Sequence, residues 1–266
     1  RLKKQLKVLA EKSRQDGEQP IQYVLTVPAV KDLTTFEPNW PEKTSAEYWR
    51  KKYRSIPSRS FMREYMHVHV EDGKVFKAED IQWKKMLPLN EYDALVFYGD
   101  LSYKAQACHK GMILVGKKDR EFHFIYCFLR QQSRTVLAKW LYDLYETTEL
   151  RTCRKVRYWI EGLFSMDEFV NDFDAEGDAR GYYIPVQADK RPKADKYDRI
   201  EATQSYFERR NVWFNIDERD SPDFQELVDQ YLAFEKGGSV AVDGPDAGEG
   251  ALSKLNTVFR QVKGTY

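Results

Sequence analysis

The chain has 266 residues, which is enough for one large domain or for a domain with a substantial extension. Hydrophobic residues make up 42% of the chain, an ordinary fraction that supports a packed core. The 43 basic and 42 acidic residues leave a net charge of +1, so a surface that attracts nucleic acid would have to be local. No apolar run approaches the ~18 residues of a membrane span, which excludes a transmembrane protein.

Few features of the sequence bear on its compartment. The three cysteines, Cys108, Cys127 and Cys153, lack metal-ligand spacing and cannot all pair, which favours a reducing compartment. The N-terminal stretch is charged and polar and does not resemble a signal peptide. Because the chain begins with Arg1 and not with Met, we expect it to be a piece of a longer protein.

The run Asp93–Lys117 contains the strand that we expect to be the most deeply buried. Its first half, Ala94–Tyr98, is apolar and rich in strand-forming residues, and Asp100 follows it. Two further apolar runs, Gly111–Gly116 and Phe122–Leu129, complete a predicted three-strand meander. Asp100 either caps the turn after the strand or binds a metal ion, because a buried carboxylate is costly unless something pairs with it.

The first part of the chain contains predicted helices, a short one over Ser60–Met66 among them, and a pair of histidines. Arg1–Arg14 has the spacing of a surface helix, and a second helix begins at Thr44 or Ser45. His67 and His69 would share one face of a strand, where a metal pair is geometrically feasible. No third ligand lies nearby, so ordinary packing or exposure of the two histidines is favoured.

Helices and strands alternate after the meander. Two acidic, glycine-containing segments, Asp172–Gly181 and Glu235–Gly250, are expected to be loops, and the second carries Asp243 and Asp246. The remaining expected elements are a helix over Ser133–Tyr145, a strand over Lys155–Ile160 followed by Glu161, a helix that begins near Ser165, a strand over Tyr182–Val186, a helix over Tyr197–Arg209, a strand over Val212–Phe214, and helices over Ser221–Phe234 and Ala251–Val262.

Acidic residues therefore stand at the ends of two expected strands and beside the last helix. If the first and fourth strands are neighbours, Asp100 and Glu161 meet at one edge of the sheet, and Asp243 or Asp246 can close the cluster. Such carboxylates repel one another unless a divalent cation neutralises them, and Mg²⁺ or Mn²⁺ prefers oxygen ligands. Two ions about 3.5–4 Å apart can support phosphoryl displacement, which is nuclease chemistry. A chance arrangement among 42 acidic residues is the alternative.

Five stretches follow one another in a recognisable order. They are the segment containing Trp40–Tyr48, Phe61–Met66 and Glu71–Ile81, then VFYGDLSYKA around Asp100, YWIEGLF around Glu161, Asp195–Asn215, and VDGPDAGEGAL around Asp243 and Asp246. The series resembles the C-terminal nuclease domain of the large terminase subunit of tailed bacteriophages or prophages. Each motif is weak alone, but the series covers nearly the whole chain from about residue 35.

This resemblance implies an RNase H-like α/β fold, in which a mixed sheet of an antiparallel three-strand meander plus parallel strands is flanked by helices. It implies a metal-dependent endonuclease that cuts double-stranded concatemeric DNA by a two-metal hydrolytic mechanism, with Mg²⁺ or Mn²⁺ as cofactor. By the same likeness, Asp100, Glu161 and Asp243 are catalytic metal ligands, and Asp246 is a further candidate ligand.

Two positions depart from the pattern of this family. Cys108 or His109 stands where the family often has a second aspartate, and Val242 occupies the first position of its paired acids near the end. The departures leave open which of Asp243 and Asp246 binds metal. They also favour an alternative, a catalytically degenerate DNA-binding or docking module of the packaging motor. A Holliday-junction resolvase-like nuclease with the same acids is a third interpretation.

The resemblance also implies the surroundings of the domain. No GxxxxGK[ST] loop occurs, so the phosphate cradle of a packaging ATPase is missing. Residues 1–88 would be the linker or extension that follows the ATPase domain, and residues 89–266 would be the nuclease domain. The implied partners are double-stranded DNA, the ATPase domain of the same full-length chain, the small terminase subunit and the portal. The implied location is the cytoplasm of the bacterial host, without membrane contact.

Basic residues near the acids are candidate contacts to DNA phosphates, which position a duplex without reading its sequence. Because Asp189 and Asp195 dilute the basic charge of the loop Asp189–Lys196, a solvated charge run is the alternative there. The candidates are Lys190, Arg191, Lys193 and Lys196 in this loop and Lys104 near the first acid.

Overall fold

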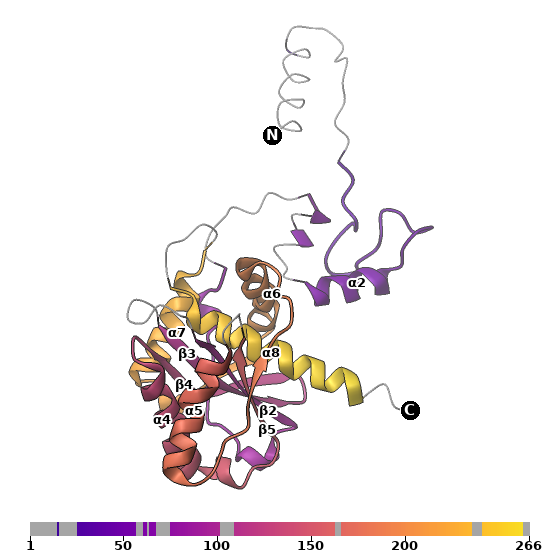
Figure 1. The fold of residues 1–266 in the computed structure, drawn as a ribbon. Helices are drawn as coiled ribbons and strands as arrows, with labels where there is room; N and C mark the ends of the chain where they lie inside the picture. The colour runs from indigo at the N-terminus through magenta and orange to yellow at the C-terminus, as the bar shows by residue number, and fades with distance from the viewer. Residues whose placement is uncertain are drawn as a thin grey trace. The chain divides into compact units, whose positions relative to one another are not determined.

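The computed structural model of the chain contains two compact units, Arg1–Glu71 and Asp72–Tyr266 (Figure 1). Residues 75–88, which the sequence assigns to the extension, are part of the second unit, and strand β1 (Trp83–Lys84) within them joins its sheet. The structure describes residues 15, 26–56, 61–62, 64–67, 75–101, 109–162, 166–235 and 241–262.

The first unit is built around helix α2 (Ala46–Ser55) and a small aromatic core. Ser45 is the N-cap of α2, as predicted, and its side chain accepts a hydrogen bond from the backbone N–H of Tyr48. Phe61 is fully buried, and its ring centroid lies 5.2 Å from that of Tyr53 on α2. Aromatic contacts therefore hold this helix onto its unit.

Two of the predictions for the first unit concern residues that the structure does not describe. The expected helix Arg1–Arg14 and His69 both lie outside the described residues. His67 is described and is exposed, with a positive φ of 56°.

A mixed sheet of seven strands organises the described part of the second unit, in the order β1-β7-β4-β3-β2-β5-β6. Strands β2, β3 and β4 form the predicted antiparallel meander, and the pairs β2–β5, β5–β6, β4–β7 and β1–β7 are parallel. The first and fourth predicted strands, β2 and β5, are thus neighbours. The strands are β2 (Ala94–Leu101), β3 (Lys110–Lys118), β4 (Glu121–Arg130), β5 (Val156–Glu161), β6 (Val186–Asp189) and β7 (Val212–Asn215).

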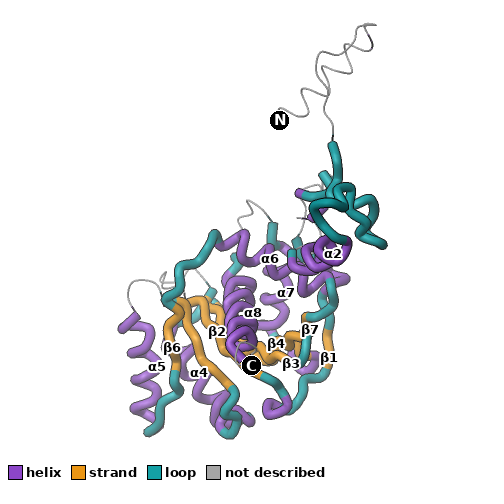
Figure 2. Tube along the Cα trace, turned by 90° about the vertical axis from the view of Figure 1, so that its right-hand side faces the viewer, coloured by secondary structure: helices purple, strands orange, loops and turns teal. Residues whose placement is uncertain are grey.

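Helices cover both faces of this sheet (Figure 2). Helices α6, α7 and α8 pack on one face and α4 and α5 on the other. Among the described helices, none has the length and apolar composition that a bilayer span requires. The helices are α4 (Arg134–Thr147), α5 (Met166–Arg180), α6 (Lys196–Glu208), α7 (Pro222–Ala233) and α8 (Asp243–Val262), with short 3₁₀ turns at Ala78–Asp80, Leu89–Glu91, Glu149–Arg151 and Ile216–Glu218.

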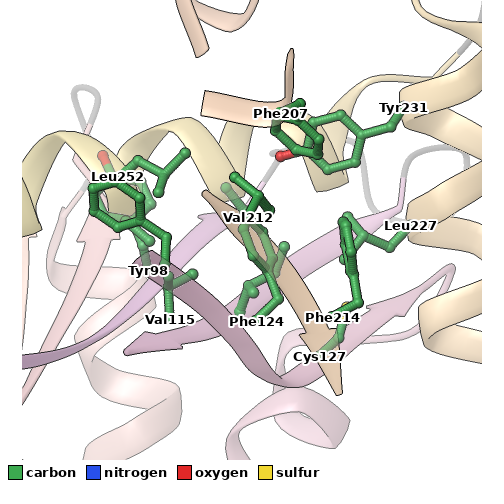
Figure 3. Packing of buried hydrophobic residues seen from close by; sticks show 14 of the residues in the cluster. Tyr98, Val115, Phe124, Cys127, Phe207, Val212, Phe214, Leu227, Tyr231 and Leu252 are labelled. Carbon is green, nitrogen blue, oxygen red and sulfur yellow. The ribbon is translucent and has the colours of Figure 1, made fainter. Parts of the chain in front are cut away.

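Burial on both faces explains why β2 is apolar from Ala94 to Tyr98. Successive side chains of a strand point to opposite faces, and both faces of β2 are covered. Val96 and Tyr98 pack toward α8, whereas Leu95 and Phe97 pack toward α4, and all four are buried. Figure 3 shows the cluster on the α8 side, where the Tyr98 ring lies beside Leu252. The predicted fold class, a mixed sheet flanked by helices, is therefore confirmed.

The expected loop Asp172–Gly181 is wrong, because α5 continues to Arg180. Tertiary contacts compensate for the acidic composition of this segment. Arg180 pairs with Glu176 one turn earlier and with Asp143 of α4, at 2.7 and 2.5 Å. Phe173 is buried against the sheet, and Gly181, with φ 77°, ends the helix in a conformation that glycine adopts readily.

The strand expected over Tyr182–Val186 is also displaced, because β6 begins only at Val186. Pro185 has no N–H to donate to a ladder, so pairing with β5 starts after it. β6 lies at the edge of the sheet, where a neighbouring proline is tolerated. The shift has a consequence for the site, since Asp189 becomes the last residue of a strand and not the first residue of a loop.

The loop expected over Glu235–Gly250 is likewise wrong in its second half, because α8 begins at Asp243. Glycines normally weaken a helix, but here they let it lie against the sheet. A Cβ on Gly250 would lie within 2.6 Å of three atoms of the Tyr98 ring, and one on Gly248 would collide with the Tyr231 hydroxyl. Close packing onto β2 therefore decides where this helix begins, and local propensity does not.

We predict that Gly250→Ala destabilises the chain, although alanine favours helix over glycine by roughly 1 kcal/mol. Tyr98 is fully buried and cannot move aside without disturbing β2, and overpacking of this kind costs about 1–3 kcal/mol. Urea denaturation should therefore show a net loss of up to about 2 kcal/mol in the free energy of unfolding. Thr257→Ala, at an exposed position of α8, is the control. Equal stability of Gly250→Ala and the unchanged chain would contradict the packing.

Candidate metal centre

Asp100 stands near the end of β2, the strand that pairs with both β3 and β5. It lies on the same face as Tyr98, two residues earlier, and therefore points toward α8. Only 9% of the residue is exposed, so its carboxylate requires partners within the protein.

Glu161 is the last residue of β5 and lies beside Asp100 because the two strands are parallel. The register pairs Gly99 with Ile160, which brings the residues that follow each of them to the same edge of the sheet. Glu161 is half-buried and shares the face of Trp159, which packs toward α8. The expected meeting of the two strand ends is thus present.

The first turn of α8 supplies two further acids, Asp243 and Asp246. Their carboxylates benefit from the positive end of the helix dipole. Asp246 is 2% exposed, whereas Asp243 is half-buried. One carboxylate oxygen each of Asp100, Glu161 and Asp246 lies within 4.8 Å of the others. We call these three residues the acid cluster; Asp243 lies at its border, outside this oxygen group.

Cations from α6 compensate the charge of the acid cluster. Lys196 Nζ lies 3.1 Å from Asp100 Oδ2, 3.0 Å from Asp246 Oδ2 and 3.9 Å from Asp243 Oδ1. Arg199 Nη1 lies 2.8 Å from Asp246 Oδ1 and also pairs with Glu249. One turn of α6 thus places both cations over the first turn of α8.

The pKa values of the acids differ with the cations that reach them. Burial raises the pKa of Asp100 to about 7, against the effect of Lys196 and with a further contribution from the neighbouring acids. Burial also raises the pKa of Asp243. Burial would do the same for Asp246, but Lys196 and Arg199 hold its pKa below the ordinary value. Burial would lower the pKa of Lys196, but the negative charges of Asp100 and Asp246 hold it above its ordinary value.

The donor set fits a divalent cation such as Mg²⁺ or Mn²⁺. Three carboxylate oxygens converge from two strand ends and one helix, and hard cations of this kind prefer oxygen ligands. Burial raises the pKa of Asp100 although Lys196 opposes the shift, and a bound cation would favour the ionised form in the same way as Lys196. Asp100, Glu161 and Asp246 are the residues that would hold the ion.

The predicted DNA-contact residues occupy different environments. Lys190 is exposed, whereas Lys193 Nζ lies 2.8 Å from Glu161 Oε1 and Lys196 is turned into the acids. Arg191 is exposed but binds Asp189 with its Nε and Nη2 atoms, both at 2.8 Å. Lys104 lies outside the described residues. The loop is therefore not a simple solvated charge run, since two of its lysines contact the acid cluster.

Asp189 is a buried acid of this face that the sequence did not identify as functional. It pairs in register with Glu161, and its carboxylate accepts hydrogen bonds from the hydroxyl of Tyr98, at 3.1 Å, and from Arg191. Lys254 Nζ, from α8, lies 3.0 Å from it. Burial opposes ionisation, but Arg191 and Lys254 hold the pKa of Asp189 well below its usual range. Only the strand register could have identified it.

The positions that depart from the family pattern lie around Asp243. His109 Nε2 lies 3.5 Å from Glu226 Oε1 of α7, and Val242 packs against the core as the residue before α8. Cys108 lies outside the described residues.

The chain matches known proteins through its structure. No protein-family model matches it, and no curated protein matches it in sequence. The large terminase of a thermophilic bacteriophage, in its second crystal form, superposes with a TM-score of 0.55, at 15% sequence identity. That match covers 80% of this chain and 52% of the phage protein, so the chain spans about half the length of that terminase.

A shorter protein matches over nearly its whole length. The human cytomegalovirus terminase nuclease domain superposes with a TM-score of 0.50, at 12% identity, and the match covers 67% of this chain and 94% of that domain. Sequence identities this low establish the fold alone. The chain therefore has the RNase H-like fold of a terminase nuclease domain, as its motifs predict.

Proposed function

We propose that this chain is the metal-dependent endonuclease domain of a bacteriophage or prophage DNA-packaging terminase, and that it cuts double-stranded concatemeric DNA. The observation that carries the proposal is the convergence of Asp100, Glu161 and Asp246 at one edge of the sheet. Three carboxylates from separate elements would form a divalent-cation site, on a fold that the chain shares with terminase nuclease domains.

The acid cluster would hold one or two Mg²⁺ or Mn²⁺ ions. When bound, such ions activate water and stabilise the leaving 3′ oxygen during hydrolysis of a phosphodiester. Asp100 and Asp246 would exchange their contacts with Lys196 for contacts with metal. We assign the third ligand to Asp246, because one of its carboxylate oxygens belongs to the acid cluster. Asp243, which the family pattern favours as third ligand, would support the site from the same helix turn.

The basic residues beside the cluster would position the duplex through its phosphates. Lys193 and Lys196 already lie against the acids, so they would lie within reach of a phosphate brought to the same place. Lys190 and Arg191 are exposed on the same loop, and Lys104 is proposed from the sequence alone. Contacts of this kind would hold the duplex without reading its sequence.

The full-length protein would contain more than this chain. We propose that an ATPase domain precedes it, since the chain spans about half of the large terminase of the thermophilic bacteriophage. Strand β1 lies within the predicted extension 1–88 and joins the sheet of the second unit, so we propose that the linker ends before this strand. By family likeness, the small terminase subunit and the portal would be further partners in the cytoplasm of the bacterial host.

One observation favours a second candidate, a degenerate DNA-binding or docking module of the motor. Lys196 and Arg199 already contact Asp100 and Asp246, so the cluster is partly neutralised by the chain itself. A protein that no longer bound metal would keep such ion pairs, because buried unpaired charges are costly.

We predict that Mn²⁺ supports nicking and linearisation of supercoiled plasmid by the purified chain, and that EDTA stops it. Glu161→Gln should lower the rate at least about a hundredfold, because changes in the outer partners of a metal alone cost ~10–100-fold. Gel electrophoresis of the plasmid measures the rate. Absence of cleavage together with absence of metal binding would support the degenerate module. Cleavage of a four-way junction but not of linear duplex would support the resolvase-like interpretation.

We predict that Asp246→Asn abolishes plasmid cleavage and that Asp243→Asn only weakens it. Both substitutions remove one charge from the same helix turn, but only Asp246 contributes an oxygen to the acid cluster. Rates measured at saturating Mn²⁺ should differ by about tenfold or more between the two variants. Thermal unfolding shows whether both are folded. A larger loss for Asp243→Asn would assign the third ligand to Asp243.

We predict that the chain binds Mn²⁺ more tightly at pH 8 than at pH 6. Because burial raises the pKa of Asp100 to about 7, this carboxyl is mostly protonated at pH 6, and the ion has to displace the proton. At pH 8 it is mostly ionised, so calorimetric titration should show about tenfold higher affinity. Asp100→Asn should bind weakly at both pH values. Equal affinity of the unchanged chain at both pH values would contradict a pKa near 7 for Asp100, and unaltered affinity of Asp100→Asn would show that Asp100 is not a ligand.

A further inference from the structure

A pocket opens beside the acid cluster, between the loop that connects β6 to α6 and the middle of α8. Its volume is about 140 Å³, room for roughly four or five waters. Figure 2 shows this loop leaving β6 and reaching α6 beside α8. The wall includes Arg191 and Lys193 of the loop, Arg199 of α6, and Glu249, Gly250 and Ser253 of α8. We call it the loop pocket.

The loop pocket is lined by three cations and one acid. Glu249 pairs with Arg199, so its charge is compensated within the wall. Asp189 lies behind the wall and holds Arg191 by two hydrogen bonds to Nε and Nη2, while 43% of the Arg191 side chain stays exposed. The lining of the pocket therefore carries two more cations than acids, although acids outside the lining also pair with these cations. The guanidinium of Arg191 is held in a defined orientation by Asp189.

Two cations of the loop pocket also touch the acid cluster. Lys193 Nζ lies 2.8 Å from Glu161, and Arg199 Nη1 lies 2.8 Å from Asp246. A strand whose reacting phosphate lies at the acid cluster would thus bring another part of its backbone to the pocket. Arginine forks match phosphate oxygens in geometry as well as charge.

We propose that the loop pocket binds a backbone phosphate of the DNA strand, next to the phosphate that is cut. This proposal rests on the proposed nuclease function and extends it with a subsite that includes Arg199 and Ser253. Arg191, Lys193 and Arg199 supply the charge of the subsite. The subsite holds the strand without reading its sequence.

Ser253 allows a direct test because it lines the pocket and lies outside the acid cluster. Ser253→Glu adds a negative charge to the pocket. Ser253→Arg adds a positive charge on a side chain that is larger than glutamate. Thr257→Glu makes the same charge change one turn later, on the exposed part of α8. Binding of a fluorescent random-sequence duplex is measured by anisotropy in EDTA across a salt series, after thermal unfolding has shown that each variant is folded.

Ser253→Glu should weaken duplex binding at least about fivefold, since two unit charges ~4 Å apart in water interact by about 1 kcal/mol. The slope of log affinity against log salt should also fall by about 1 if one phosphate contact is lost. Ser253→Arg should bind as tightly as the unchanged chain or more tightly, and Thr257→Glu should bind as the unchanged chain does. The subsite is overturned if Ser253→Glu and Ser253→Arg weaken duplex binding equally, or if Ser253→Glu does not weaken it.

The source of the phosphate and the nuclease proposal are tested separately. Inorganic phosphate added as competitor should displace the duplex only weakly; if Ser253→Glu changes this competition but not duplex affinity, the pocket binds free phosphate and the DNA subsite is wrong. Metal-dependent plasmid cleavage with unaltered duplex binding by Ser253→Glu overturns the subsite and leaves the nuclease standing. Absence of cleavage together with the expected binding pattern overturns the nuclease proposal and leaves the phosphate subsite standing.

Discussion

Compensation of buried acidic charge is the constraint on which this structure depends. Four acids on one face of the sheet, Asp100, Glu161, Asp189 and Asp246, lie where water reaches them poorly. A buried charge is tolerated only when a partner offsets the loss of hydration. Each of the four has at least one: Lys196 for Asp100, Lys193 for Glu161, Arg191 and Lys254 for Asp189, and Lys196 with Arg199 for Asp246.

These pairs connect elements that are distant in sequence. Lys196 links the start of α6 to the end of β2 and to α8, and Lys254 links α8 to β6 while its ammonium lies 3.5 Å from the Trp159 ring centroid. The network therefore fixes the loop between β6 and α6 as well as the acids. Because Lys193 and Arg199 contact the acid cluster and also line the loop pocket, the proposed metal centre and the proposed phosphate subsite share these two cations.

Much of the fold follows from local patterns. The apolar runs of the meander, the N-cap serines of α2, α4 and α7, and Pro222 at the start of α7 could all be recognised in the sequence. Composition misled where packing overrides it. The acidic end of α5 is helical because Arg180 reaches acids on two helices, and the glycine-rich start of α8 is helical because it lies directly on Tyr98.

For the site, the sequence by itself determined that Asp100 and Glu161 lie at or near strand ends. Asp100 follows an apolar run of strand length, and Glu161 follows a run of mostly strand-forming residues. It could not choose between Asp243 and Asp246, which lie within one turn of α8. The rotation of α8 on the sheet decides which of the two carboxylates faces the other acids. It also assigned Asp189 to a loop. Those outcomes depend on the pairing of β5 with β6 and on the docking of α8, which are contacts between residues far apart in the chain. Only the tertiary structure decides them, because no local pattern encodes the register or rotation of packed elements.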